Sequence, residues 1–71
     1  MAVFTSAAIA LRRKIITEAL KNSGATSPET AKTLAEAGTE NPDLFPEYTE
    51  QLVSFGVIRR TADGKYWTVE D

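Results

Sequence analysis

Four glycines divide the chain and limit the length of every element that it can form. Gly24, Gly38 and Gly56 each follow apolar residues at helical spacing, where glycine favours the left-handed conformation that ends a helix. Gly64 follows Asp63 between two runs rich in β-branched and aromatic residues, and Asp-Gly in that setting predicts a hairpin turn. The spacing therefore predicts three helices followed by one hairpin.

The core of this chain must form without covalent or metal support. None of the 71 residues is a cysteine or a histidine, which excludes disulfides and zinc sites of the usual type. The composition, 42% hydrophobic and 25% charged, is that of an ordinary globular protein, and the length fits a single domain over residues 1–71. We expect no cofactor.

The first segment predicts a helix from about residue 5 to 23. Its apolar residues recur at spacings of three and four and form one stripe, made of Phe4, Ala8, Leu11, Ile15 and Ala19 and widened by Ala7, Ile16 and Leu20. The helix is also basic, because it carries Arg12, Arg13, Lys14 and Lys21 against the single acid Glu18.

The first eleven residues carry no charge. A membrane span needs roughly 20 apolar residues, and a secretory signal places its bases before the apolar run rather than after it. We therefore do not expect a membrane role, and the lack of cysteine suits the cytoplasm. One alternative stays open, namely that this run is the remaining end of a removed membrane anchor, because bases after an apolar run mark the cytoplasmic end of a span.

A second, short helix is predicted over about residues 28–37. Ser27 is a good N-cap, Pro28 fits the first helical position, and Glu29 suits the positive end of the helix dipole. Small apolar residues then recur up to Gly38, which gives this helix a narrow face for close packing.

A third helix is predicted over about residues 44–55. Its core side would hold Leu44, Tyr48, Leu52 and Phe55, with Phe45 beside them. With Asp43 as the cap, Pro46 falls in the first turn, where the backbone N–H groups need no helical partner. We expect the aromatic residues at helical spacing, Phe4 included, to pack in the core.

The last segment predicts a hairpin over about residues 57–69. A two-residue turn at Asp63-Gly64 would pair Arg60 with Trp67 and place Ile58 opposite Val69, which would close the core. Arg60 would then make a cation–π contact with Trp67. A one-residue bulge would shift this register, and that alternative stays open. Tyr66 and Trp67 would lie on opposite faces of the hairpin.

This order of elements resembles a winged-helix domain, the winged form of the helix-turn-helix. The most specific stretch runs from Leu52 to Trp67, where the third helix ends at Gly56 and leads directly into the wing. Residues 27–31 also resemble the start of the family's second helix. The resemblance spans about residues 5–70 and implies an α+β fold, a small winged helix of three helices and a C-terminal two-stranded wing. The connection over residues 38–42 is longer than a tight helix-turn-helix turn.

The resemblance implies DNA binding, but the charges oppose it. The third helix would contact DNA through its outward residues Glu47, Glu50, Gln51 and Ser54. Residues 41–56 hold three acids and no base, whereas contacts to phosphate need lysine and arginine. Residues 1–24 carry four bases and one acid, and residues 41–71 carry three bases and six acids. This polarity suits a complementary protein or a second copy of the chain.

The sequence therefore favours a non-catalytic interaction module that binds a protein partner or forms a homodimer. The alternative is a DNA-binding transcriptional regulator that contacts DNA through the basic wing. The candidate contact residues for either function are Arg59, Arg60, Lys65, Trp67, Arg13 and Lys14. We expect no enzyme and no small-molecule substrate, because Glu47 and Glu50 lie one turn apart without a nucleophile, a phosphate loop or a metal motif.

Overall fold

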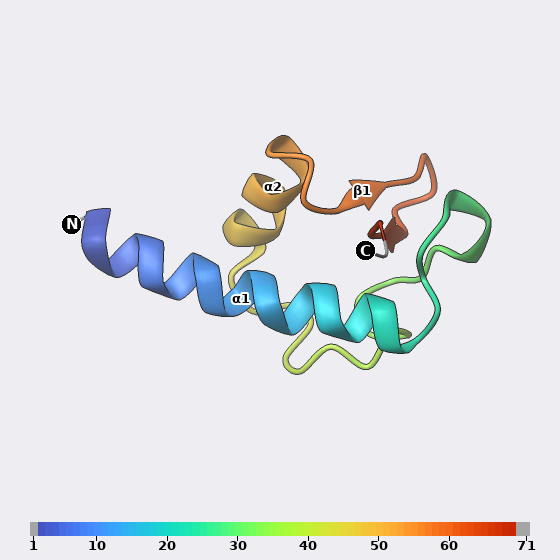
Figure 1. The fold of residues 1–71 in the computed structure, drawn as a ribbon, viewed down its shortest axis with the longest axis horizontal. Helices are drawn as coiled ribbons and strands as arrows, with labels where there is room; N and C mark the ends of the chain where they lie inside the picture. Colours follow the sequence, from blue (N-terminus) through green and yellow to red (C-terminus); the bar gives the residue numbers. More distant parts are fainter. Residues whose placement is uncertain (1, 70–71) are drawn as a thin grey trace.

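The computed structural model describes residues 2–69 of the chain, with side chains from residue 7 onward. The elements follow in the order α1 (Ala2–Asn22), the 3-10 turn η1 (Pro28–Thr30), α2 (Pro46–Ser54), β1 (Arg59–Arg60) and β2 (Tyr66–Trp67). The long helix α1 runs along the molecule, and α2 and the antiparallel hairpin lie on one side of it (Figure 1). The first turns of α1 extend beyond the other elements, and the molecule is 38 Å long against 24 and 21 Å in its other dimensions (Figure 1).

The expected winged helix of three helices is wrong, because the middle segment is not an α-helix. The described chain has two α-helices, and the predicted helix over residues 28–37 is replaced by η1, an extended stretch and a single turn over residues 34–38. The backbone N–H of Lys32 donates to the carbonyl of Tyr66 at 2.9 Å, and its carbonyl accepts the N–H of Tyr66 at 2.7 Å. A helix would use this N–H and this carbonyl in its own hydrogen bonds, so the bridge between Lys32 and β2 excludes a helix at this position.

Side-chain caps also divide this middle segment. The Thr33 hydroxyl accepts the N–H of Glu36 at 3.1 Å, and the Glu36 carboxylate accepts the N–H of Thr33 at 3.0 Å. This reciprocal pair is a capping box, and it starts a new turn at Thr33. Upstream, the Thr30 hydroxyl accepts the N–H of Ser27 at 3.1 Å, so Ser27 begins only the short η1.

Glycines end both α-helices, as the sequence predicts. Gly24 follows α1 and Gly56 follows α2, with φ angles of +83° and +76°. The N–H of Ala25 donates to the carbonyl of Leu20 at 2.8 Å, which is the long bond of a Schellman motif. The same pattern follows α2 at 3.0 Å. Helix α1 begins at Ala2, three residues before the predicted start at about residue 5, and α2 begins at Pro46, two residues after the predicted start at about residue 44.

The core consists of seven buried hydrophobic residues, namely Ile16, Leu20, Ala25, Leu34, Ala37, Leu52 and Ile58. On α1, Ile16 and Leu20 are fully buried, but Leu11 of the predicted apolar stripe is 62% exposed. Arg12 lies one turn before Ile16 and is only 4% exposed. The inward side of α1 is therefore rotated by about one residue from the predicted stripe. The Phe4 side chain lies outside the described part.

The start of α2 differs from the prediction. Phe45 precedes the helix in the left-handed region, with φ +52°, so Asp43 is not the cap. Pro46 occupies the first turn, as expected. Leu52 is buried, but Phe45 and Phe55 are 43% and 74% exposed. The expectation that these two aromatic side chains pack in the core is wrong, because neither is among the buried residues of the core cluster.

The hairpin pairs Arg59 with Trp67 and Arg60 with Tyr66, one residue away from the register expected for a two-residue turn. The loop has three residues, over 62–64, because the N–H of Thr61 donates to the carbonyl of Lys65 at 2.8 Å. Gly64 ends this loop in the left-handed conformation, at φ +83°, as three-residue hairpin loops require. The shifted register is thus the alternative that the sequence left open.

The shifted register changes which residues close the core. Ile58 is fully buried, as expected, but Val69 is 53% exposed. Thr68 takes the inward position and is 4% exposed. Its hydroxyl donates to the carbonyl of Val57 at 3.1 Å, and its N–H donates to the carbonyl of Ala25 at 3.0 Å. The end of the hairpin is therefore tied to the core by hydrogen bonds rather than by the predicted valine.

Candidate functional site

Arg12 fastens α1 to the loop over residues 39–45. Its guanidinium donates to the carbonyls of Glu40 at 3.0 Å, Asn41 at 2.9 Å and Pro42 at 3.4 Å. Burial lowers the pKa of Arg12, but an arginine keeps its charge in proteins. Its Nε atom is buried and has no partner within the described residues. The sequence analysis counted Arg12 among the bases of a basic helix surface, whereas the structure uses it as a buried fastening.

The same loop contains two non-glycine residues in the left-handed region. Asn41 has φ +49° and Phe45 has φ +52°. Asparagine tolerates this conformation, but a bulky aromatic residue there is an outlier that costs about 1–3 kcal/mol. The ring of Phe45 stacks on Tyr48 with centroids 4.9 Å apart, which offsets part of that cost. The loop thus holds a large aromatic ring in a partly exposed position.

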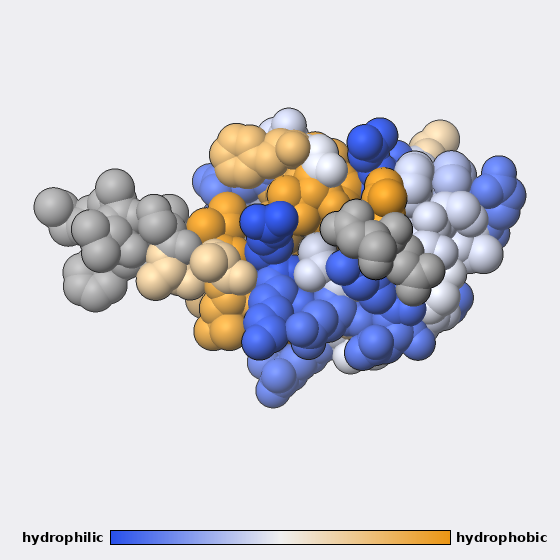
Figure 2. All heavy atoms as spheres, viewed as in Figure 1, coloured by the Kyte–Doolittle hydropathy of each residue, from blue (hydrophilic) through white to orange (hydrophobic). Residues whose placement is uncertain are grey.

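An apolar groove of about 160 Å³ lies between α1 and this loop. We call it the α1–loop groove, and its apolar walls are Ala8, Leu11, Ile15, Leu44 and Phe45. Leu11, Leu44 and Phe45 remain 62%, 44% and 43% exposed. Hydrophobic residues gather over the part of α1 that follows its first turns and over α2, whereas hydrophilic residues lie over the middle of α1 (Figure 2). Exposed apolar side chains gathered in this way mark an interaction surface.

The arginines of the hairpin are engaged within the fold. Arg60 donates to the two carboxylate oxygens of Glu50 at 2.6 and 2.8 Å, and to the hydroxyl of Tyr66 at 3.3 Å. These bonds lower the pKa of Glu50 and raise that of Arg60. The guanidinium of Arg59 lies 5.7 Å from the centroid of Trp67. The predicted contact between Arg60 and Trp67 is wrong, because the register shift gives Trp67 to Arg59.

The structure spreads the candidate contact residues over two elements. Arg59, Arg60 and Trp67 lie on the hairpin, and Lys65 lies between its turn and β2. Arg13 lines a separate surface hollow between α1 and the residues around Gly56 and Thr68, and Lys14 is exposed elsewhere on α1.

The ion pair between Glu50 and Arg60 is a contact that sequence reasoning missed. Glu50 is exposed, as expected for an outward residue of this helix, and its carboxylate also binds Arg60. The two residues lie ten positions apart on either side of the turn at Gly56, and no sequence spacing indicates that pairing.

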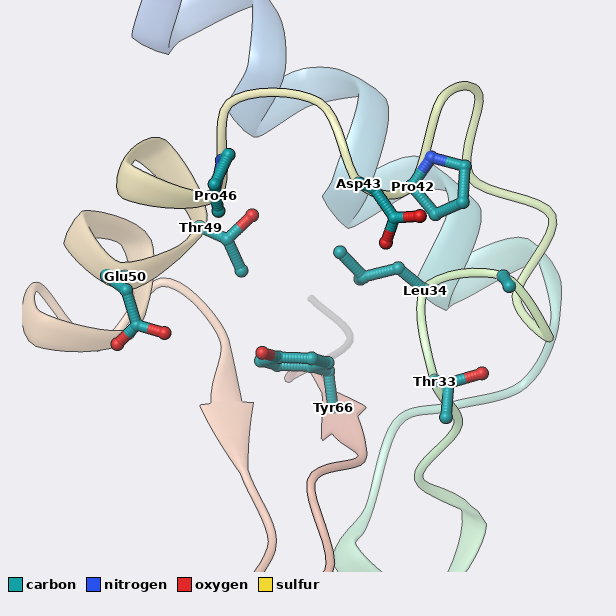
Figure 3. Close-up of a pocket in the computed structure, with 9 residues that line it drawn as sticks. Thr33, Leu34, Pro42, Asp43, Pro46, Thr49, Glu50 and Tyr66 are labelled. Atoms are coloured by element: carbon teal, nitrogen blue, oxygen red, sulfur yellow. The ribbon is translucent and has the colours of Figure 1, made fainter.

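A larger cavity, of about 500 Å³, borders the same loop (Figure 3). Its lining includes Leu34, Asp43, Pro46, Thr49 and Tyr66. Thr49 is 5% exposed, and its hydroxyl has no hydrogen-bond partner within the described residues. An unpartnered buried hydroxyl costs about 1–3 kcal/mol, so this group marks a place that a ligand atom would satisfy.

Over residues 2–69, no group of three or more histidine, cysteine or acidic residues is placed to hold a metal ion. Neither of the described α-helices is long and apolar enough to cross a membrane. A comparison of the chain with family models, curated proteins and solved structures finds no match. The functional proposal therefore rests on the geometry of the chain itself.

Proposed function

We propose that this chain is a non-catalytic interaction module that forms a homodimer through the α1–loop groove. The observation that carries the proposal is the exposure of Leu11, Leu44 and Phe45 around one apolar hollow. A chain with only seven buried hydrophobic residues in its described core leaves much of its apolar surface unused in the monomer. Covering these side chains with a second copy would bury them by the same hydrophobic effect that forms the core.

The shape of the groove suits a two-fold pair. A two-fold interface uses the same patch on both copies, so the patch must contain both a projection and a recess. Leu11 projects from α1, and the recess lies between α1 and Phe45. In such a pair Leu11 of one copy enters the recess of the other, and the reverse contact forms by symmetry.

The distribution of charge also supports a second copy of the chain as the partner. The groove lies where the basic first 24 residues meet the acidic region that starts at residue 41. Lys14 of α1 is exposed, and Glu40 lines the loop wall of the groove. A two-fold partner brings the basic helix of one copy towards the acidic side of the other, which guides its orientation.

The proposal includes no catalysis and a cytoplasmic location. The carboxylate of Glu50 is held by two hydrogen bonds from Arg60, which leaves Glu47 without the second acid of a catalytic pair. The absence of cysteine suits a reducing compartment.

Sedimentation velocity over a range of concentrations tests the dimer. We expect the mass to rise from monomer to dimer with concentration, and the dimer to weaken as salt screens the charges. Leu11→Glu should weaken the dimer at least about tenfold, since a charge would enter an apolar contact. Phe55→Glu is the matched control, because Phe55 is 74% exposed but does not line the groove. A wild-type chain that stays monomeric throughout, or equal loss in both variants, contradicts the proposal.

DNA binding through the hairpin can be tested with the same purified chain. Mixed-sequence duplex at low salt should not bind, because Arg60 already holds Glu50 and α2 presents acids. Salt-sensitive binding that Arg59→Ala abolishes would favour the wing as the functional site instead.

A further inference from the structure

The cavity beside α2 has the composition of a ligand site, and it is separate from the α1–loop groove. Its volume of about 500 Å³ falls within the range of small-molecule pockets (Figure 3). Leu34 and Pro46 form apolar walls, and Tyr66 closes the side opposite Asp43 (Figure 3). A ligand that fills it would therefore combine an apolar stem with a small number of polar contacts.

The polar groups of this cavity favour a cation. Asp43 directs its carboxylate into the space beside Leu34, and the Thr49 side chain reaches into it from α2 (Figure 3). Thr49 is only 5% exposed, and its hydroxyl has no hydrogen-bond partner within the described residues. A hydroxyl oxygen and a carboxylate both accept hydrogen bonds, and an ammonium group donates three.

The surroundings disfavour an anion. No lysine or arginine is among the lining residues. Pro46 has no backbone N–H, so the first turn of α2 offers one donor fewer than an ordinary helix start. The guanidinium of Arg60, which contacts the lining residues Glu50 and Tyr66, is neutralised by the Glu50 carboxylate.

We propose that this cavity binds an alkylammonium group, with the ammonium held by Asp43 and Thr49 and the alkyl stem lying along Leu34 and Pro46. The group comes either from a free primary amine or from a lysine side chain of a peptide, since both present the same head and stem. In either case the ligand gives the Thr49 hydroxyl the partner that it lacks.

An NMR titration of the whole chain tests this site with butylamine, which is protonated at neutral pH, and with butyrate as the anion of matched stem. We expect butylamine to shift the amide signals of Leu34, Thr49 and Tyr66 in a saturable manner, and butyrate to leave them unchanged. A short lysine peptide with blocked ends forms the second arm. Stronger binding of the peptide would assign the site to a peptide, and stronger binding of the free amine would assign it to small amines.

Two variants and one control make the test sharp. Asp43→Asn keeps the shape of the side chain but removes its charge, and it should weaken butylamine binding at least about tenfold. Thr49→Val removes only the hydroxyl and should weaken binding by a smaller factor. Asp63→Asn, in the hairpin loop, removes an equal charge outside the cavity and should change nothing. Equal responses to butylamine and butyrate, absence of saturation, or full binding by Asp43→Asn would overturn the proposal.

Discussion

The hairpin and the α1–loop groove both expose large side chains, but they differ in how many contacts these side chains make within the chain. On the hairpin, Arg60 has two bonds to Glu50 and one to Tyr66, and Arg59 lies over Trp67. In the groove, Leu11 and Leu44 remain 62% and 44% exposed. The polar surface is largely satisfied within one copy, whereas the apolar surface is not.

In a very small domain, exposed apolar side chains indicate a partner surface better than exposed charges do. Charged side chains at a surface find partners in water or in one another at little cost, so their exposure indicates little. Large apolar side chains gain free energy only when another surface covers them. Arg12 and the strained Phe45 fix the position of the groove wall, which gives the groove a defined shape in the monomer.

The largest expected effect is that of Arg12→Met. The substitution removes three hydrogen bonds from a buried guanidinium, and we expect a loss of about 3 kcal/mol in the free energy of unfolding. That loss corresponds to about 15 °C in Tm for a domain of this size. Thermal unfolding followed by circular dichroism, at concentrations where the chain is monomeric, measures it.

Arg13→Met is the matched control for Arg12→Met, because Arg13 is exposed on the next position of α1. We expect it to change stability by no more than about 0.5 kcal/mol. Equal losses in both variants would show that Arg12 does not fasten the loop.

Phe45→Gly separates the shape of the groove from its apolar contact. Glycine removes the strain of the left-handed backbone but also the stacking on Tyr48, so monomer stability should change by less than about 1 kcal/mol. The dimer should weaken about tenfold, because an apolar wall of the groove is lost. Sedimentation velocity and urea unfolding of the same samples measure the two effects. A dimer as strong as that of the wild type would remove Phe45 from the interface.

The ion pair between Arg60 and Glu50 should contribute little to stability. Its side chains are 34% and 59% exposed, so a double-mutant cycle with Arg60→Ala and Glu50→Ala should give a coupling energy of about 0.5–1 kcal/mol. Neither variant should alter the dimer. A change in dimerisation upon Arg60→Ala would show that the hairpin, and not the groove alone, contacts the second copy.

The smallest expected effect is on the pH dependence of stability. The pKa of Glu50 is lowered by Arg60, that of Glu36 by the N–H of Thr33, and that of Asp63 by the Thr61 hydroxyl. A lowered pKa in the folded state stabilises the fold fully above the unfolded value, which is 4.5 for glutamate, and this stabilisation is lost as pH falls through the folded value. Urea unfolding over a pH series measures the free energy of unfolding at each pH. In Glu50→Gln, this free energy should fall less steeply as the pH is lowered. An unchanged slope would contradict the assignment to Glu50.

Local signals predicted the ends of elements better than the faces that those elements bury. Gly24, Gly56 and Gly64 act through the backbone of their own turns, and their positions were predictable for that reason. The middle helix failed because Lys32 is bound by Tyr66, a residue 34 positions later in the chain. A long-range bridge of that kind leaves no periodic signal in the sequence.

The candidate site was harder to predict than the fold. The helical spacing placed Leu11 in the core, because an apolar stripe does not show which neighbouring row of residues faces inward. The burial of Arg12 decides this, and it depends on three carbonyls of a loop whose path the sequence does not specify. Arg60 was a candidate because it is basic, whereas its partner Glu50 lies on a different element and was not predicted.

The most direct test of the α1–loop groove as a dimer interface is an isotope-filtered NMR experiment on a mixture of labelled and unlabelled chains. Such an experiment detects only contacts between two copies. We predict contacts that join the side chain of Leu11 in one copy to Leu44 and Phe45 in the other. Intermolecular contacts confined to the hairpin, or none at concentrations where the dimer should dominate, would contradict the account.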